Sequence, residues 1–402
     1  MRICAVVLLL AASARPAMAA KTVTVGQFED LLDKLHGKSD NRVAEEFSDL
    51  ELTERVSPAR LAKWEADFPG TKAHEALIKL VDLAAFLNPP AADVLPIPAP
   101  DSDTQERMLA LAAAYVKTTI TRLPNFFATR QTTHFEDTPS QQAVTGQPGA
   151  GGSILRAMRT LSIAINSTEY KSLHSTGSST TTVTYRDGYE VHDGNTVKDG
   201  NRDKSSMRLT TVGEFGPILS VVLGDAMRSE VDWQRWEKGA GDPVAVFRYA
   251  VPAEQSNYTV GVPVGDKIER VYPGYHGEIA IDPATGAILR LSLVAEMPPP
   301  YEAMQTAMLV EYAPVVIGDQ SYICPARGVA FSRTPVTHPA ASQPGSAANM
   351  QTHLNHVTFT QYHVFRADAR IVPDAGGKGD APAAPSSTPP PPAGAASGDQ
   401  GR

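Results

Sequence analysis

Several histidines in this sequence have spacings close to those of metal sites, but none of the patterns is complete. His74 opens a His-Glu pair like the start of the zinc-protease motif, but Ile78 stands where the second histidine belongs. His353, His356 and His363 fall on or near one expected strand. About 30 Å of extended chain separates the first from the last, and His356 points to the other face. We therefore predict no metal site.

Two loop patterns for ions are incomplete as well. Gly37-Lys38-Ser39 matches the end of a phosphate-binding loop, but Leu32 replaces the earlier glycine that such a loop requires. A helix stop followed by a helix cap is the better interpretation. Asp199, Asn201 and Asp203 alternate like the first ligands of a calcium loop, without its turn glycine and its final glutamate. We interpret them as a polar turn, with a weak surface cation site as the alternative.

The local signatures of nucleophilic catalysis do not occur in the sequence. It contains neither Gly-x-Ser-x-Gly nor Ser-x-x-Lys, although Ser, His and Asp residues can still meet from distant positions. Cys324 lies in an apolar stretch, which favours a buried, inert thiol over a nucleophile. Trp233 and Trp236 follow an apolar segment, where packing is favoured over a ligand-facing platform. We predict a protein that is not an enzyme, with no catalytic residues and no cofactor.

Charge and the first residues of the chain limit its class. The 402 residues carry a net charge of −8 without a block of Lys or Arg, which argues against nucleic acid as a partner. Residues 1–20 have the charged start, short apolar run and small residues of a secretory signal. No stretch reaches the roughly 20 apolar residues of an integral membrane span. We expect a secreted protein, periplasmic or extracellular.

Helical spacing of apolar residues dominates the segment 21–88. Such residues recur every three or four positions over 25–35. Ser57-Pro58 supplies an N-cap and a first-turn proline for a second helix, which Pro69-Gly70 ends. Thr71 can cap a third helix. The sequence therefore predicts an α-helical module over residues 21–88.

A proline-rich stretch over residues 89–103 is expected to be an extended linker after this module. Ser102 begins a capping box for the next helix, predicted over 104–123. Leu111 and Ala112 belong to the face of this helix that we expect to be buried. The helix opens the main domain, which we place at residues 104–372.

From residue 126 onward, β-branched and aromatic residues alternate with turn residues, as is typical of strands. The predicted strands cover 127–135, 180–185, 277–281, 288–295, 308–312, 315–317, 327–333 and 357–365. An apolar segment at 215–227 has helical spacing and can cover the sheet together with the helix over 104–123. The predicted fold class is α+β, with a curved antiparallel sheet covered by helices. Residues 373–402 are a Pro/Ala/Gly-rich tail that we expect to be disordered.

The late strands carry a resemblance to a known family. It rests on the segment from Gly277 to Arg290, with its turn Asp282-Pro283-Ala284-Thr285-Gly286, and on Val310-Glu311-Tyr312 and Ile317 to Tyr322. This succession resembles secreted proteins of acidobacteria whose β part is similar to the periplasmic lipoprotein-carrier superfamily, LolA-like and RseB-like. The resemblance covers about residues 125–372. It implies an antiparallel half-barrel whose concave apolar face is covered by helices and receives acyl chains or a protein segment.

An imperfect helical cover over such a sheet leaves an apolar pocket. We therefore predict a non-catalytic protein whose partner is a hydrophobic small molecule, a lipid, an acyl chain, an apolar peptide or an envelope protein. The fourteen predicted lining residues are Val183, Tyr185, Phe215, Leu219, Val222, Phe247, Tyr249, Ile279, Ile281, Leu289, Leu291, Leu293, Met308 and Val310. Each of them would suit an ordinary core equally well. Two alternatives stay open: a structural or interaction module of the cell envelope with a self-filled core, and a hydrolase with a dispersed site.

Overall fold

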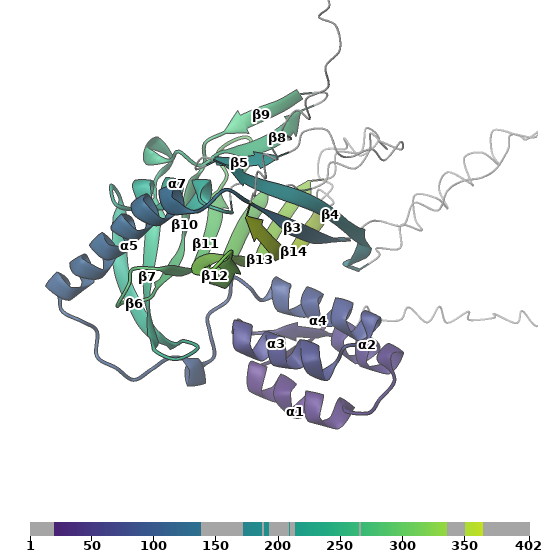
Figure 1. Ribbon diagram of the computed structural model, residues 1–402. Helices are drawn as coiled ribbons and strands as arrows, with labels where there is room; N and C mark the ends of the chain where they lie inside the picture. Colours follow the sequence, from purple (N-terminus) through teal and green to yellow (C-terminus); the bar gives the residue numbers. More distant parts are fainter. Residues whose placement is uncertain are drawn as a thin grey trace, which may run out of the picture. The chain divides into compact units, whose positions relative to one another are not determined.

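The alternating apolar residues of the later chain build one large sheet (Figure 1). The computed structural model describes residues 20–137, 172–186, 189–192, 209, 214–264, 267–335 and 350–364, which belong to one unit. Ten strands in the order β5-β4-β3-β14-β13-β12-β11-β10-β7-β6 pair antiparallel throughout. The strands are β3 (Phe126–Glu136), β4 (His174–Arg186), β5 (Tyr189–His192), β6 (Glu230–Lys238), β7 (Pro243–Val251), β10 (Gly274–Ile281), β11 (Ile288–Glu296), β12 (Gln305–Ile317), β13 (Gln320–Pro335) and β14 (Met350–Val364). A separate hairpin consists of β8 (Val260–Val264) and β9 (Lys267–Val271).

The predicted α+β class with an antiparallel sheet is confirmed. The two strands expected at 308–312 and 315–317 are one strand, β12, whose pairing with β13 shifts register between Glu311 and Tyr312. A bulge of this kind keeps the strand continuous while it breaks the alternation of the sequence. β6 has no counterpart among the predicted strands, because its charged residues and tryptophans give no clear alternation of apolar and polar positions.

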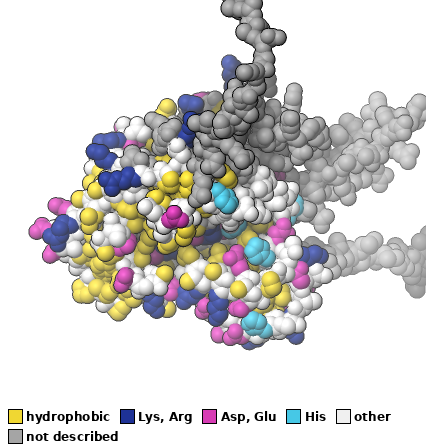
Figure 2. Space-filling model, viewed as in Figure 1, with side chains coloured by type: hydrophobic (Ala, Val, Ile, Leu, Met, Phe, Trp, Pro, Cys, Tyr) yellow, Lys and Arg dark blue, Asp and Glu magenta, His cyan; other side chains and the backbone are white. Residues whose placement is uncertain are grey.

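Two helices cover one face of the sheet, which we call the helix face. They are α5 (Ser102–Arg122) and α7 (Pro217–Ala226), close to the predicted positions. Met108, Ala112 and Val116 follow one stripe of α5 and pack with α7 and with β7, β10, β11 and β12 in the largest apolar cluster. Leu111 was expected in this stripe, but it lies to one side and is 42% exposed. Hydrophobic side chains gather where α5 lies on the molecular surface (Figure 2).

The turn between β10 and β11 touches α5 directly. Gly286 has a φ of +77°, and a Cβ added there would lie 2.5 Å from the backbone of Leu111 and 2.8 Å from the nitrogen of Ala112. Helix and turn therefore approach each other more closely than any side chain would allow.

We expect Gly286→Ala to lower the free energy of unfolding by about 2–4 kcal/mol, because it adds a backbone clash to the strain of a positive φ. Gly318→Ala is the matched control, since φ is also positive there (+67°) but the nearest atom is a side-chain methyl of Val364 at 3.3 Å. Urea denaturation measures both variants. Equal losses would show that the helix and the turn are not in close contact.

The N-terminal segment forms helices around a core of its own. The elements are β1 (Lys21–Val23), α1 (Val25–Leu35), α2 (Asp40–Ser48), β2 (Leu50–Leu52), α3 (Pro58–Asp67) and α4 (Thr71–Leu83), with β1 and β2 paired in parallel. The ring of Phe28 in this core has its centroid 5.2 Å from that of Phe47 and 5.0 Å from that of Trp64. The cap of α4 differs from the expected one, because Asp40 of α2 accepts hydrogen bonds from the backbone of Lys72 and Ala73.

The proline-rich stretch lies against the edge strand β6. The backbone nitrogen of Leu95 donates to the carbonyl of Trp236 at 3.0 Å. The indole nitrogen of Trp236 in turn donates to the carbonyl of Pro98 at 3.1 Å. Trp236 also packs against Trp233, with centroids 4.9 Å apart. The stretch therefore covers an otherwise unpaired sheet edge, which protects such an edge from pairing with other chains.

Some predicted features fall outside the described residues. These are the signal sequence up to residue 19, the polar turn at Asp199, Asn201 and Asp203, and the tail over 373–402. Among the helices that the structure describes, none has the length and the apolar character needed to cross a membrane.

Candidate functional site

The structure places thirteen of the fourteen predicted lining residues inside packed clusters on the helix face. None of the thirteen is more than 6% exposed. Ten of them form part of the cluster beneath α5 and α7: Leu219, Val222, Phe247, Tyr249, Ile279, Ile281, Leu291, Leu293, Met308 and Val310. The other three, Val183, Tyr185 and Phe215, pack with Phe126 and Phe359 in a neighbouring cluster. The side chains of α5, α7 and the sheet thus fill most of this face.

Leu289 is the exception, and a bulge explains its position. β10 pairs Ala280 with Arg290 but the next residue, Ile281, with Ile288, so that Leu289 is an extra residue on β11. Leu289 is half-buried and packs against a small separate cluster that includes Val246. Simple alternation placed it on the same face as Leu291 and Leu293, and the bulge turns it aside.

Leu289 lines a pocket of about 400 Å³ beside the C-terminal half of α5. The pocket lies between this helix, the β10–β11 turn and the start of β13. Its lining residues are Tyr115, Thr118, Thr119, Arg122, Asp282, Thr285, Ala287, Leu289, Ser321, Tyr322 and Ile323. We call it the α5 pocket. Its volume falls within the range of about 300–1,000 Å³ that is typical of small-molecule sites.

The α5 pocket combines an apolar floor with a polar rim. Tyr115 and Ile323 pack against the large apolar cluster from its margin, and Ala287 is buried. At the rim, Asp282 accepts a hydrogen bond from Thr285 at 2.8 Å and is held within its own turn. Arg122 is exposed and has no ion pair among the described residues. An amphipathic ligand with an anionic end matches this arrangement.

A second constellation, which no sequence motif indicates, lies across three neighbouring strands of the sheet. His134 on β3 is placed between Asn355 on β14 and Ser179 on β4. Its Nδ1 is 2.9 Å from Oδ1 of Asn355, and its Nε2 is 3.1 Å from Oγ of Ser179. In the pairing of β3 with β4, Gly177 is directly opposite His134, and Ser179 lies two residues further along β4.

The hydrogen bonds favour one tautomer of His134. The amide nitrogen of Asn355 donates to the carbonyl of Leu209 at 2.6 Å, so its Oδ1 faces His134 and accepts from Nδ1. In this tautomer, Nε2 carries the lone pair and accepts from the hydroxyl of Ser179. This order of nucleophile, base and orienting group is the one used in acyl transfer. The α5 pocket does not include these residues.

Buried charges occupy the other face of the sheet, which packs against α4 and which we call the module face. Asp82 of α4 is 2.9 Å from Nδ1 of His356 and also pairs with Arg327. Arg327 donates to Glu311 at 2.8 Å. Burial alone would raise the pKa of Asp82, but His356 and then Arg327 lower it. The attraction between these charges in a place of low polarity outweighs the cost of removing them from water.

A second buried ionic cluster surrounds Glu237 on β6. Arg55 donates to both of its oxygens, at 2.9 and 3.0 Å. Arg290 donates to them at 3.0 and 3.2 Å, and Arg235 donates to Oε1 and to Glu278. Burial alone would raise the pKa of Glu237, but Arg290 and Arg55 lower it to about 2. The two clusters tie the N-terminal helices to the sheet.

The three histidines of β14 have three different environments. His356 pairs with Asp82, His353 lies 3.5 Å from Glu136, and the ring of His363 lies 5.3 Å from that of Phe127. Within the described ranges, no group of three or more His, Cys, Asp or Glu side chains could hold a metal ion. Cys324 is 1% exposed, and burial raises the pKa of its thiol to about 12, which confirms the predicted buried thiol.

Comparison of the chain with protein-family models, with curated proteins and with solved structures gave no match.

Proposed function

We propose that the protein is a non-catalytic, exported binding protein that holds a hydrophobic ligand with an anionic end, such as a fatty acid or the acyl part of a lipid. The observation that carries this proposal is the α5 pocket, with its apolar floor and with Arg122 at its rim, which has no ion pair among the described residues. We further propose that the antiparallel sheet with α5 and α7 is the helix-covered half-barrel of the lipoprotein-carrier type. Export rests on the signal pattern of residues 1–20.

The packing of the helix face determines where such a ligand would enter. The thirteen buried lining residues leave little space beneath α5 and α7, so insertion there would require the helices to move apart. At the α5 pocket, Leu289 and Tyr115 are only half-buried and already form an open floor. An acyl chain can therefore bury its surface there at about 25 cal/mol for each Å² without displacing a helix.

Titration with a fluorescent fatty-acid probe tests this function. We expect saturable binding to the full chain and at least tenfold weaker binding to Thr118→Trp, because the indole fills the mouth of the α5 pocket from an exposed position. Ala110→Trp is the matched control, since it places the same ring at an exposed position of α5 outside the pocket. Arg122→Gln should weaken binding of the fatty acid but not binding of its methyl ester.

A chain that binds no probe would contradict the proposed function. The structural or interaction module of the cell envelope would then be favoured, and the close packing of the thirteen buried residues is the observation that supports it. Equal weakening by Thr118→Trp and Ala110→Trp would place the ligand outside the α5 pocket.

The Ser179–His134–Asn355 constellation supports a second candidate function, an acyl hydrolase. If it is active, Ser179 Oγ attacks the phosphorus of a fluorophosphonate probe, His134 takes the hydroxyl proton and fluoride leaves. We then expect covalent labelling of the full chain and none of Ser179→Ala. Ser178→Ala is the control, because this neighbour is exposed and points to the other face of β4. A chain that is not labelled, or a Ser179→Ala variant that is, would exclude this candidate.

A further inference from the structure

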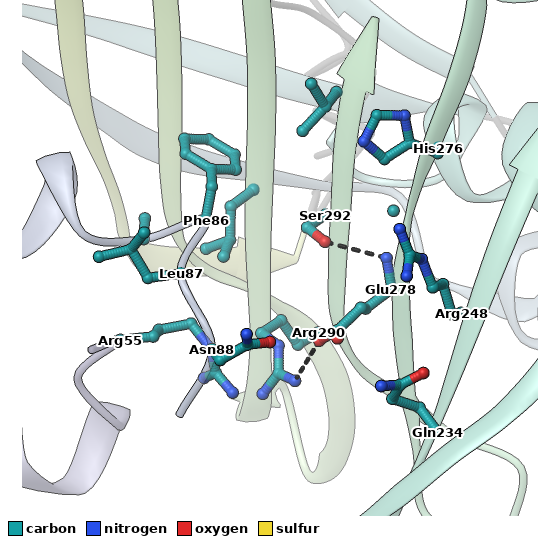
Figure 3. Close-up of a pocket in the computed structure, with 14 residues that line it drawn as sticks. Arg55, Phe86, Leu87, Asn88, Gln234, Arg248, His276, Glu278, Arg290 and Ser292 are labelled. Atoms are coloured by element: carbon teal, nitrogen blue, oxygen red, sulfur yellow. Dashed lines mark hydrogen bonds and ion pairs between the residues drawn. The ribbon is translucent and has the colours of Figure 1, made fainter. Parts of the chain in front are cut away.

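A second pocket lies on the module face, between the segment that follows α4 and the strands β7, β10 and β11 (Figure 3). Its volume is about 240 Å³. Its lining includes Arg55, Phe86, Arg248, Glu278, Arg290 and Leu309. We call it the arginine pocket. In Figure 3, Phe86, Leu87 and Asn88 approach from one side, Arg248 and His276 lie on the other, and Arg290 and Ser292 lie between them.

Positive charge exceeds negative charge in and around the arginine pocket. Three guanidinium groups line it, from Arg55, Arg248 and Arg290, against the single carboxylate of Glu278. Glu278 is already neutralised by Arg235, which donates to both of its oxygens at 2.7 Å. With Glu237 included, four guanidinium groups face two carboxylates; the next carboxylate, Glu311, also attracts Arg55 but is paired with Arg327.

The excess charge is carried by groups that have spare hydrogen-bond donors. Arg55 is 5% exposed and gives only Nη2 to Glu237, so its Nε and Nη1 donate to no acceptor among the described residues. Arg248 has no ion-pair partner in the described part of the chain. Burial, and next the repulsion by Arg290, lower the pKa of Arg55. Arg55 shares the carboxylate of Glu237 with Arg235 and Arg290, so a bound anion would supply an acceptor for the donors that Glu237 does not reach.

The rest of the lining is apolar and lies opposite the charged groups. Phe86 and Leu309 contribute to the cluster between α4 and the sheet, and Ala85 and Val294 also line the pocket. The volume lies below the range of about 300–1,000 Å³ that is usual for drug-sized ligands. The site therefore has room for a small molecule with one charged end and a short apolar body.

We propose that the arginine pocket binds a small organic oxyanion, with its anionic group on Arg55, Arg248 and Arg290 and its apolar body against Phe86 and Leu309. Guanidinium groups present paired N–H donors in a plane that matches the oxygens of carboxylates and phosphates. The ligand would touch both the N-terminal helices and the sheet, so it would hold them together. This site is separate from the α5 pocket, and the proposal does not depend on the proposed function.

Calorimetric titration of the full chain with three probes tests the proposal. Benzoate has the charge and the apolar body, inorganic phosphate has only the charge, and benzyl alcohol has only the body. We expect saturable binding of benzoate, weaker binding of phosphate and none of benzyl alcohol. Arg248→Gln should weaken the binding of benzoate at least tenfold. Arg248 is exposed and outside the buried ion pairs, so this variant should fold normally.

Arg333→Gln is the matched control, because it removes the charge of another exposed strand arginine away from the pocket. Benzoate binding that Arg248→Gln weakens and Arg333→Gln does not would support the site. The proposal is overturned if neither anion binds or if benzyl alcohol binds as tightly as benzoate. It is also overturned if both variants weaken the binding of benzoate equally. Fatty-acid binding at the α5 pocket is measured separately with Thr118→Trp, so the two proposals can fail independently.

Discussion

Replacing Asp82 by alanine is expected to lower the free energy of unfolding by about 3–5 kcal/mol, the range typical of a broken buried ion pair. Asp82 is fully buried and accepts from both His356 and Arg327. Without its carboxylate, Arg327 keeps only Glu311 as a partner in a buried position. The contact between α4 and β14 would also lose the hydrogen bond between Asp82 and His356. Urea denaturation at neutral pH measures the loss.

Two control variants separate charge from volume and from general effects. Asp82→Asn keeps the side-chain volume and one acceptor, so its free energy of unfolding should fall less than that of Asp82→Ala. Asp33→Ala removes an exposed carboxylate of α1 and should stay within about 0.5 kcal/mol of the unmodified chain. If Asp82→Ala were as stable as Asp33→Ala, the packing of α4 on the sheet described above would be contradicted.

Acid should remove the contribution of Asp82 in a defined direction. Its pKa in the folded chain is lowered below the ordinary value of 3.8. The carboxylate therefore stabilises the fold fully above pH 3.8, and this stabilisation is lost as the pH falls toward the folded pKa. A chain with Asp82→Asn should lose less stability over that interval.

Replacing Glu237 by glutamine is expected to lower the free energy of unfolding by about 3 kcal/mol at pH 7. The reason is that Arg55, Arg235 and Arg290 all donate to this one carboxylate. The pKa of Glu237 gives the same size of effect. It falls from 4.5 to about 2 on folding, and each unit corresponds to about 1.4 kcal/mol. Differential scanning calorimetry or urea denaturation of the full chain measures the change in stability.

The pH dependence of this variant is as informative as its stability at neutral pH. In the unmodified chain, the contribution of Glu237 is complete above pH 4.5 and disappears as the pH falls to about 2. Glu237→Gln should therefore lose less stability than the unmodified chain over this interval. Glu254→Gln, at an exposed position, is the control and should follow the unmodified chain. Parallel acid curves for Glu237→Gln and the unmodified chain would contradict a lowered pKa.

Local signals in the sequence were sufficient for most of the helices and strands. The proline at position 58 and the cap at Ser57 define the start of α3, where Ser57 accepts from the backbone of Arg60. The apolar runs of β10 and β11 likewise mark strands that lie within a few residues of the predicted ranges. These features depend on neighbours in the sequence, which is why composition and spacing reveal them.

Features that depend on residues far apart in the chain could not be predicted. Asp82 and His356 are 274 positions apart, and Arg55 and Glu237 are 182 apart. One signal was available: Arg290 and Glu311 each interrupt an apolar strand, and a charged residue on a covered face requires a partner. The identity of that partner is a property of the tertiary fold alone.

The predicted lining was limited by the same problem. Core residues and pocket residues have the same composition, so thirteen of the fourteen lie where packing is dense. Leu289 lines the α5 pocket only because a bulge breaks the alternation of β11. Bulges leave no reliable mark in a single sequence. Tyr115 and Ile323 come from an amphipathic helix and from a neighbouring strand, and only the fold brings them together.

Hydrogen–deuterium exchange of the full chain, with and without a saturating long-chain fatty acid, tests the central claim that the α5 pocket is the ligand site. We expect slower exchange in the C-terminal half of α5 and in the turn between β10 and β11, where the pocket lies. Unchanged exchange in both segments while the fatty acid is bound, or protection confined to other strands, would contradict it.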